Sequence, residues 1–203
     1  MSLLYRFLRF IIRPLFKLAF WYRIKKTKTK IPDGGCLICS NHISAIDPVF
    51  LGLGLKRQLR FLAKSELEKA PVLGRLLKKF GITVRRGTAD ISAMKAAIGT
   101  LSDGNLLCVF PQGTRRKGLI PAETEIKSGS GMMACYSKCS VVPAYIYAKG
   151  YRLKPFCRLK ITFGEPIKYE ELGFEKNNKA EIDAASKLIW DRICELAPEK
   201  KEG

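Results

Sequence analysis

Residues 36–48 read CLICSNHISAIDP, and this stretch carries the strongest indication of the fold. Its first five residues are a short apolar run of the kind that forms a buried strand. Pro48 then stands in the first turn of a helix expected over residues 48–55, where the missing N–H of proline is tolerated. His42 and Asp47 therefore lie where a strand passes into a helix.

The rest of the chain continues this alternation. Further strands are expected over residues 59–63, 82–85, 105–110, 141–147 and 158–163. Further helices are expected over 65–70, 72–80, 90–101, 127–138 and 179–196. The alternation predicts an α/β fold: a single domain over residues 31–203, with a mainly parallel or mixed central sheet flanked by helices.

The charge of the chain is strongly unbalanced. Its 203 residues include 37 Lys plus Arg against 18 Asp plus Glu, a net charge of +19. This excess indicates a polyanionic partner: nucleic acid, an anionic membrane surface or a phosphate-bearing substrate. A nucleic-acid-binding protein would interleave aromatic and basic residues on one sheet face. Here the basic runs neighbour an apolar helix instead, so no nucleic acid is expected.

The seven cysteines are an odd number and lie in apolar runs, which favours reduced thiols in a core. Cys36 and Cys39 form a CxxC pair, a spacing found in zinc and redox sites. No second pair has ligand spacing and His42 is the one histidine, so no metal site is predicted.

Residues 1–30 form a predicted basic amphipathic segment that associates with a membrane. No acid precedes Asp33, and four cations fall within about 80° of one helix face, opposite a wide apolar face. Pro14 is expected to kink this helix or divide it. An aromatic pair followed by cations is typical of membrane interfaces. The residues expected at the membrane are Arg6, Arg9, Arg13, Lys17, Phe7, Ile11, Phe16 and Trp21.

The positions of the charges in residues 1–30 argue against two other interpretations of this segment, a spanning helix and a signal peptide. A spanning helix would bury four cations, and a signal peptide would confine its charges to its ends and carry a small-residue cleavage site. Neither fits well. A helix packed on its own domain, with a solvated basic stripe, stays open as an alternative.

His42 and Asp47 are five residues apart, so their side chains meet only if the chain turns between strand and helix. A neutral imidazole can accept a hydroxyl proton at cellular pH, and an adjacent carboxylate would hold its tautomer. The structural alternative is that Asp47 caps the helix and His42 is a hydrogen-bonded turn residue.

Arginines follow two predicted strands. The strand over 105–110 continues into Pro111-Gln112-Gly113-Thr114-Arg115-Arg116, and Arg85 and Arg86 follow the strand over 82–85. Open α/β sheets bind ligands at the carboxyl ends of their strands, and guanidinium groups suit phosphate. A solvated basic rim is the alternative for any single arginine.

Taken together, these residues resemble the glycerolipid acyltransferase family, typified by 1-acylglycerol-3-phosphate acyltransferases. Residues 41–47 match its NHx4D motif, and residues 110–115 match FPEGTR except at Gln112. Residues 81–86 resemble the block that ends in a substrate-binding arginine, and 126–134 and 142–143 resemble two later blocks. The resemblance covers roughly residues 36–147, in the expected order.

The resemblance implies transfer of an acyl group from acyl-CoA or acyl carrier protein to the hydroxyl of 1-acyl-sn-glycerol-3-phosphate (lysophosphatidic acid), giving phosphatidic acid. His42 would be the general base and Asp47 would orient it. No cofactor is expected besides the donor. The enzyme would be peripheral or monotopic at the cytoplasmic face of the cell membrane. The residues expected to bind substrate are Arg86, Gln112, Gly113, Thr114, Arg115 and Asn41.

Two positions depart from the family pattern. The family usually has Glu at the place of Gln112, so a carboxylate role is not expected there, although a positioning role is. It often has Asp at the place of Arg85, so the anion site here is more basic and the usual acceptor is less certain. Another lysolipid or an amino-acid lipid stays open as acceptor. A non-enzymatic peripheral membrane protein is a further alternative, but it would have no use for the His42–Asp47 pair.

Overall fold

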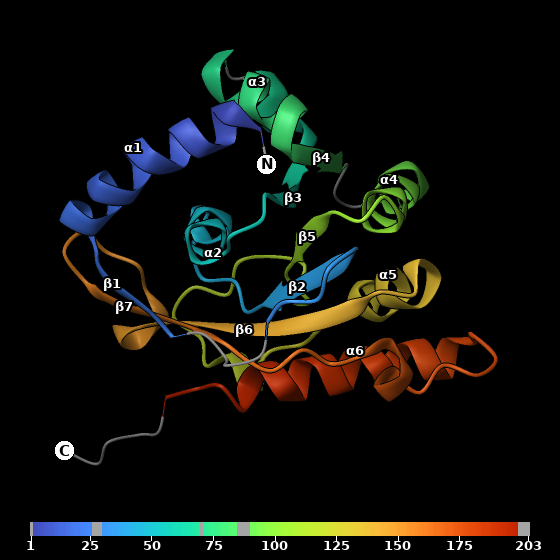
Figure 1. Cartoon of the computed structure of the whole chain (residues 1–203). Coiled ribbons are helices and arrows are strands. Elements are labelled where there is room, and N and C mark those ends of the chain that lie inside the picture. The colour runs from blue at the N-terminus through green and yellow to red at the C-terminus, as the bar shows by residue number, and fades with distance from the viewer. Residues whose placement is uncertain (1, 26–29, 70, 85–89, 199–203) are drawn as a thin grey trace.

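A computed structural model of the chain describes residues 2–25, 30–69, 71–84 and 90–198. Within these residues it contains a seven-stranded sheet with helices on both faces (Figure 1). The strands are β1 (Trp21–Lys25), β2 (Cys36–Ser40), β3 (Leu59–Lys64), β4 (Gly81–Val84), β5 (Leu106–Val109), β6 (Ser140–Ala148) and β7 (Arg158–Phe163). The α-helices are α1 (Leu3–Ala19), α2 (Asp47–Gly54), α3 (Pro71–Phe80), α4 (Ile91–Ser102), α5 (Gly129–Ser137) and α6 (Lys179–Cys194).

The strand order is β1-β7-β6-β2-β5-β3-β4. The strands β6, β2, β5, β3 and β4 run parallel, β7 is antiparallel to β6, and β1 is parallel to β7. The predicted α/β fold with a mixed central sheet is therefore confirmed. The segment Ser65–Lys69, expected as a helix, is a 3₁₀ turn.

The central strand β2 shows why its sequence is a continuous apolar run. All five of its residues are buried, because helices cover the sheet on both sides. Cys36 and Ile38 pack in the cluster beneath α2, whereas Leu37 and Cys39 pack in the cluster against α4, α5 and α6. The two thiols of the CxxC pair thus point to opposite faces of the sheet. Burial raises the pKa of the Cys36 thiol to about 12 and that of Cys39 well above its ordinary value.

The N-terminal segment differs from the expectation in two ways. The helix α1 is a single helix that contains Pro14. The carbonyl that Pro14 leaves without a helical partner belongs to Phe10, which lies on the exposed side. Residues 21–25, expected as part of a separate segment over 1–30, form strand β1 and pair with β7. A boundary at residue 30 therefore does not separate the N-terminal segment from the sheet.

Candidate active site

The parallel strands bring four segments to one edge of the sheet. At their carboxyl ends, β2 leads into Asn41 and His42, β5 into Phe110, β3 ends at Lys64, and β4 ends at Val84. Ligands of open α/β sheets bind at this edge. The sequence-predicted site is therefore built around the ends of neighbouring strands.

The turn between β2 and α2 joins His42 to Asp47. His42 Nδ1 lies 2.8 Å from Asp47 Oδ2, and the same oxygen accepts hydrogen bonds from the backbone N–H groups of Ile43 (2.7 Å) and Ser44 (2.8 Å). Asp47 is thus the first residue of α2 and its side chain folds back over the turn, rather than capping the helix. Because a carboxylate only accepts, Nδ1 carries the imidazole proton and Nε2 presents a lone pair.

His42 is held on three further sides. Its ring stacks on Phe110, with centroids 3.9 Å apart and planes 13° apart. Its backbone N–H donates to Gln112 Oε1 (2.8 Å), and its carbonyl accepts from the N–H of Arg116 (2.8 Å). The residue keeps 7% of its surface exposed. Within the described residues no side chain or backbone group bonds to Nε2. The imidazole is therefore fixed, with one nitrogen available to a substrate.

The side chain of Gln112 is bonded within the protein on both of its polar atoms. It is buried, and its Nε2 donates to Thr124 Oγ1 (2.6 Å), which in turn donates to the carbonyl of Pro121 (2.7 Å). Each group in this relay, from the His42 N–H to the Pro121 carbonyl, has a partner. Gln112 therefore has a positioning role, through the backbone of His42.

The side chain of Asn41 is also bonded within the protein. Its amide donates to the carbonyl of Ile146 (2.9 Å) and accepts from the N–H of the same residue (2.7 Å). Both side-chain polar atoms are thereby used in joining β2 to β6, and the residue is fully buried. The structure thus gives the Asn41 side chain a bond to β6 that the sequence did not indicate, because its partner lies 105 residues away and leaves no signal in the local sequence.

The loop after β5 presents the remaining predicted residues. Gly113, Thr114 and Arg115 are exposed. Gly113 has a φ of 67° and its N–H donates to the carbonyl of Phe110 (2.9 Å), a tight turn that favours glycine. Arg115 makes no ion pair with any residue that the structure describes. Arg85 and Arg86 lie outside the described residues.

Two lysines near this loop were not singled out from the sequence. Lys64 ends β3 at the same edge as His42 and lies 3.2 Å from Glu66. The side chain of Lys127 lies against Gly113, where an added Cβ would come within 3.0 Å of it. Lys64 could have been found by the signal that identified Arg115, a cation at the end of a strand, whereas the Lys127 contact depends on the folding of the loop.

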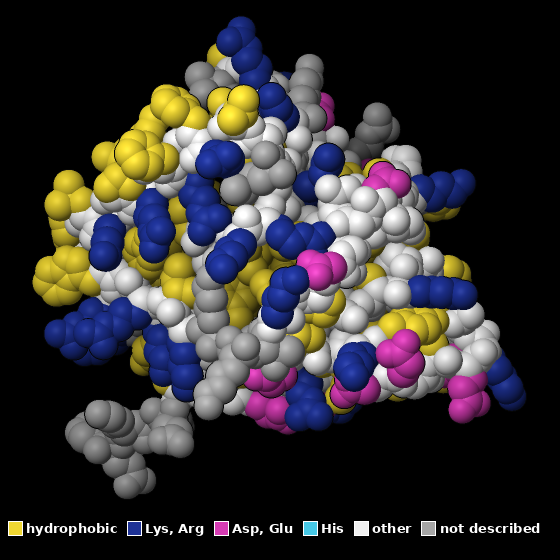
Figure 2. Space-filling view, in the orientation of Figure 1, with side chains coloured by type: hydrophobic (Ala, Val, Ile, Leu, Met, Phe, Trp, Pro, Cys, Tyr) yellow, Lys and Arg dark blue, Asp and Glu magenta, His cyan; other side chains and the backbone are white. Residues whose placement is uncertain are grey.

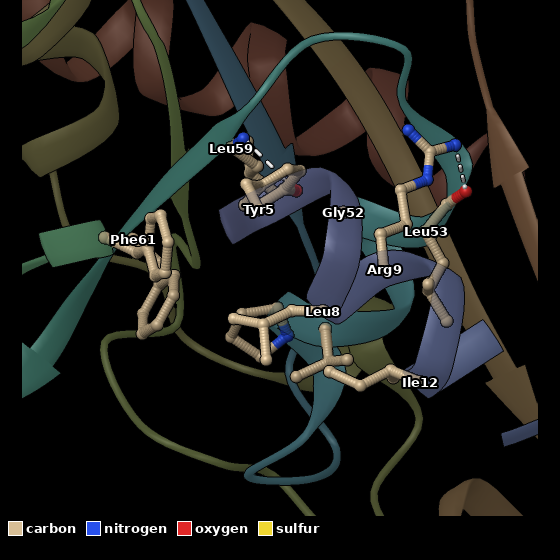
Figure 3. Close-up of a pocket in the computed structure, with 11 residues that line it drawn as sticks. Tyr5, Leu8, Arg9, Ile12, Gly52, Leu53, Leu59 and Phe61 are labelled. Atoms are coloured by element: carbon tan, nitrogen blue, oxygen red, sulfur yellow. Dashed lines mark hydrogen bonds between the residues drawn. The ribbon is translucent and has the colours of Figure 1, made fainter. Parts of the chain in front are cut away.

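An apolar hollow of about 160 Å³ begins one residue after Asp47. It lies between α1, α2, β3 and the end of α3, and Figure 3 shows Tyr5 and Leu59 joined across it by a hydrogen bond. Burial raises the pKa of Tyr5, so this phenol stays protonated. The hollow is lined by Tyr5, Leu8, Arg9, Ile12, Pro48, Val49, Gly52, Leu53, Leu59, Phe61 and Phe80.

The predicted membrane residues divide into two groups. Phe16 stacks edge-on against Phe50 of α2 (5.0 Å), and Arg9 donates to the carbonyls of Leu53 (3.0 Å) and Leu55. These two face the domain, so the packed-helix alternative holds for one face of α1. Exposed positions are Arg6, Phe7, Ile11, Arg13, Lys17 and Trp21. Figure 2 shows exposed hydrophobic side chains along α1 with a row of Lys and Arg side chains beside them. No helix in the described part of the chain has both the length and the apolar character that crossing a bilayer requires.

Comparison with known proteins agrees with this arrangement. The chain is 27% identical over 197 residues to a 1-acyl-sn-glycerol-3-phosphate acyltransferase of Bacillus subtilis, covering 95% of this chain and 96% of that protein. It is 29% identical over 146 residues to the enzyme of the same name from Borreliella burgdorferi, covering 68% of this chain and 57% of that protein.

The fold has a solved counterpart. The crystal structure of the 1-acyl-sn-glycerophosphate acyltransferase PlsC from Thermotoga maritima superposes with a TM-score of 0.69 at 23% identity, covering 95% of this chain and 79% of that one. A family model described as Acyltransferase matches residues 23–147, more than half of the sequence, and the chain therefore belongs to the acyltransferase family.

Proposed function

We propose that this protein transfers an acyl group from a thioester, acyl-CoA or acyl carrier protein, to the free hydroxyl of 1-acyl-sn-glycerol-3-phosphate, giving phosphatidic acid. The observation that carries the proposal is the buried His42–Asp47 pair, with Nδ1 and Oδ2 2.8 Å apart, beside an exposed arginine loop. The similarity to proteins named for this activity, over 95% of the chain in one case, supports it.

The chemistry requires a base and direct attack. His42 Nε2 takes the proton of the acceptor hydroxyl while the oxygen attacks the thioester carbonyl. The new ester C–O bond forms, the C–S bond breaks, and the proton passes from His42 to the departing sulfur. Asp47 stabilises the imidazolium formed in between and holds the tautomer that leaves Nε2 free. No covalent acyl-enzyme is needed.

The acceptor phosphate is assigned to arginine. Arg115 is exposed and without an ion pair in the described residues, at the loop that also holds the His42 backbone. Arg86 is proposed to join it, on the strength of its motif. A phosphate bound there places the hydroxyl of the same molecule at His42. The reacting groups are then already oriented, which lowers the entropic cost of the reaction.

The apolar hollow is proposed to receive part of an acyl chain. Nearly all of its lining is aliphatic or aromatic, and it includes Pro48, the residue that follows Asp47 in the sequence. Burying methylene groups there contributes roughly 0.8 kcal/mol each.

The exposed face of α1 is proposed to lie on the cytoplasmic leaflet of the cell membrane, as a peripheral contact. The apolar side chains Leu3, Phe7, Phe10 and Leu18 are exposed, and Arg6, Arg13 and Lys17 flank them. This composition is typical of helices that lie in the plane of an anionic interface.

The test is a reaction with defined substrates. The protein is incubated with acyl-CoA or with acyl carrier protein, together with lysophosphatidic acid and competing lysolipids and amino-acid lipids, and products are identified by mass. Phosphatidic acid is the expected main product. Transfer to another acceptor in preference would correct the substrate, and no transfer to any acceptor would reject the activity. Arg115→Ala should weaken acceptor saturation about 10- to 150-fold, the effect of losing one charged hydrogen bond.

A further inference from the structure

Exposed hydrophobic side chains gather in one region of the molecule. Of the fourteen large hydrophobic residues that are exposed in the described part of the chain, eight lie between Leu3 and Trp21. Contiguous exposed apolar surface of this kind marks an interaction site. α1 carries seven of these residues, and its exposed cations Arg6, Arg13 and Lys17 lie among them in the sequence. Exposed apolar side chains together with cations on one helix suit the surface of an anionic bilayer.

A ninth exposed residue joins this region from far along the sequence. Phe156, in the loop between β6 and β7, is 66% exposed. Its N–H donates to the carbonyl of Ala19 at the end of α1 (2.7 Å), and the N–H of Trp21 donates to the carbonyl of Cys157 (3.1 Å). These two bonds hold the loop directly beside the end of α1.

The backbone of this loop also indicates that the exposure of Phe156 is not incidental. Phe156 has a φ of 60°, a left-handed conformation that is unfavourable for a bulky side chain. Its neighbours Leu153 and Cys157 pack on the core beneath α2, so the loop is anchored on both sides of the strained residue. A strained conformation that presents an aromatic ring to solvent is characteristic of functional contacts.

The strands that follow the end of α1 carry exposed cations. β1 and β7 pair in parallel with Trp21 opposite Arg158 and Arg23 opposite Lys160. Because alternate residues of a strand share a face, Trp21, Arg23 and Lys25 lie on the same side as Arg158 and Lys160. All five are exposed, and the four cations make no ion pair within the described residues. The positive charge of this edge is therefore uncompensated.

We propose that Trp21, Phe156 and the cations Arg23, Lys25, Arg158 and Lys160 form a second contact with an anionic bilayer, here called the hairpin contact. Aromatic rings beside Lys and Arg are the composition of membrane interfaces. A single helix lying on a leaflet can still roll about its axis, and a contact at the sheet edge restricts that roll. The proposal rests on the proposed function in one respect: it takes the bilayer as the source of the lysolipid.

The test places a reporter at Phe156. The chain has two tryptophans, so Phe156→Trp in a Trp21→Phe, Trp190→Phe background gives one indole at the hairpin contact. The protein is added to vesicles of equal parts phosphatidylglycerol and phosphatidylcholine with brominated acyl chains. Quenching and a blue shift of the introduced indole are expected. Tyr136→Trp in the same background is the matched control, because Tyr136 is 57% exposed on α5 and is expected to stay unquenched.

Binding measurements complete the test. Phe156→Ser should lower partition to both anionic and neutral phosphatidylcholine vesicles about tenfold, the effect of withdrawing one aromatic side chain from the interface. Arg158→Gln with Lys160→Gln should lower partition about thirtyfold on anionic vesicles only, whereas Lys176→Gln with Lys179→Gln removes equal charge elsewhere and should have little effect.

Two results would overturn the hairpin contact: an unquenched indole at residue 156 on fully bound protein, or Phe156→Ser abolishing a concentration-dependent dimer without changing vesicle binding. No sample contains a thioester or a lysolipid, so these outcomes are independent of the acyl-transfer assay. Failure of acyl transfer with a quenched indole would reject the proposed function alone.

Discussion

The His42–Asp47 pair is the smallest unit on which the proposed activity depends. His42→Ala should lower kcat by at least about 10²–10⁴-fold, because general base catalysis contributes that much. Asp47→Asn should lose somewhat less, because the imidazole remains while its tautomer is no longer enforced. Rates are measured with saturating donor and acceptor, and a thermal melt of each variant confirms folding. His42→Ala activity within a few-fold of the unaltered protein would contradict the mechanism.

The relay through Gln112 makes a separate prediction. Gln112→Glu removes the donor to Thr124 and places a negative charge near the His42 backbone, in a buried site. kcat should fall roughly fivefold, the effect of one lost hydrogen bond.

Thr124 supplies the control for this relay. Thr124→Ser keeps the hydroxyl oxygen that accepts from Gln112, so its kcat should equal that of the unaltered protein. Thr124→Val removes this oxygen, so its kcat should fall roughly fivefold, as for Gln112→Glu. A kcat of Gln112→Glu equal to that of the unaltered protein, measured with saturating donor and acceptor, would show that the relay does not position His42.

The sequence predicted part of this site at the residue scale. His42 and Asp47 were identified because their spacing and the passage from strand to helix are local features. A positioning role was expected for Gln112, but its partner Thr124 was not. The bond of Asn41 to Ile146 was not expected either, because a hydrogen bond between residues distant in sequence leaves no pattern. The sequence shows that the side-chain amides of Asn41 and Gln112 can form hydrogen bonds, but it does not show with which residues.

At the scale of elements, α2 connects α1 to the candidate site. It begins at Asp47, and the carbonyls of Leu53 and Leu55 at its other end accept from Arg9 of α1. Orphan carbonyls at a helix end are stabilised by such a cation. The position of the His42–Asp47 turn is thereby fixed relative to the face that α1 exposes.

Arg9 and Arg13 provide a matched pair for testing this connection. Arg9→Gln should lower the free energy of unfolding by about 1.5–3 kcal/mol, because charged hydrogen bonds to α2 are lost. Arg13 is exposed, and Arg13→Gln should leave it nearly unchanged. Urea unfolding followed by circular dichroism measures both. Equal stability of the two variants would mean that α1 is not fastened to α2 through Arg9.

Gly52 tests the apolar hollow. A Cβ at this position would come within 2.9 Å of the Tyr5 hydroxyl, so Gly52→Ala narrows the hollow by about one methylene. The preference for long over short acyl chains, measured as a ratio of kcat/KM values, should fall about fourfold. Gly99→Ala is the control, because it adds the same methyl in α4 where nothing lies within 4 Å. An equal effect of the two substitutions would show that the hollow does not receive the acyl chain.

The elements were more predictable than the contacts between them. Expected strands and helices over residues 36–196 were mostly found, because the apolar runs are buried on both faces and the turns carry glycine and proline. β1 was missed, since its WYRIK sequence was interpreted as an interfacial aromatic pair followed by a basic cluster, and its partner β7 lies more than 130 residues later. Strand pairing at that separation is invisible to local pattern.

For the whole molecule, the net charge of +19 and the exposed face of α1 make a joint prediction about membranes. The structure separates the exposed residues of α1 from those that pack on the domain, so variants can be chosen that leave the fold intact. Arg6→Gln, Arg13→Gln and Lys17→Gln together should weaken binding to anionic vesicles strongly at low salt, because each cation contributes about 1 kcal/mol near the surface. Binding to neutral vesicles should hardly change.

The apolar variant should behave differently. Phe7→Ser, Phe10→Ser and Ile11→Ser should weaken binding to both kinds of vesicle, with an unchanged thermal melt, because all three side chains are exposed. High salt should weaken binding of the unaltered protein to anionic vesicles, as the glutamine substitutions do, because salt screens charges over about 10 Å at 0.1 M. Binding to neutral vesicles should not change with salt. Vesicle sedimentation beside thermal melts measures each case. Unaltered protein that stays in the supernatant with anionic vesicles would refute docking through α1, since neither its cations nor its exposed apolar side chains would then contact a leaflet.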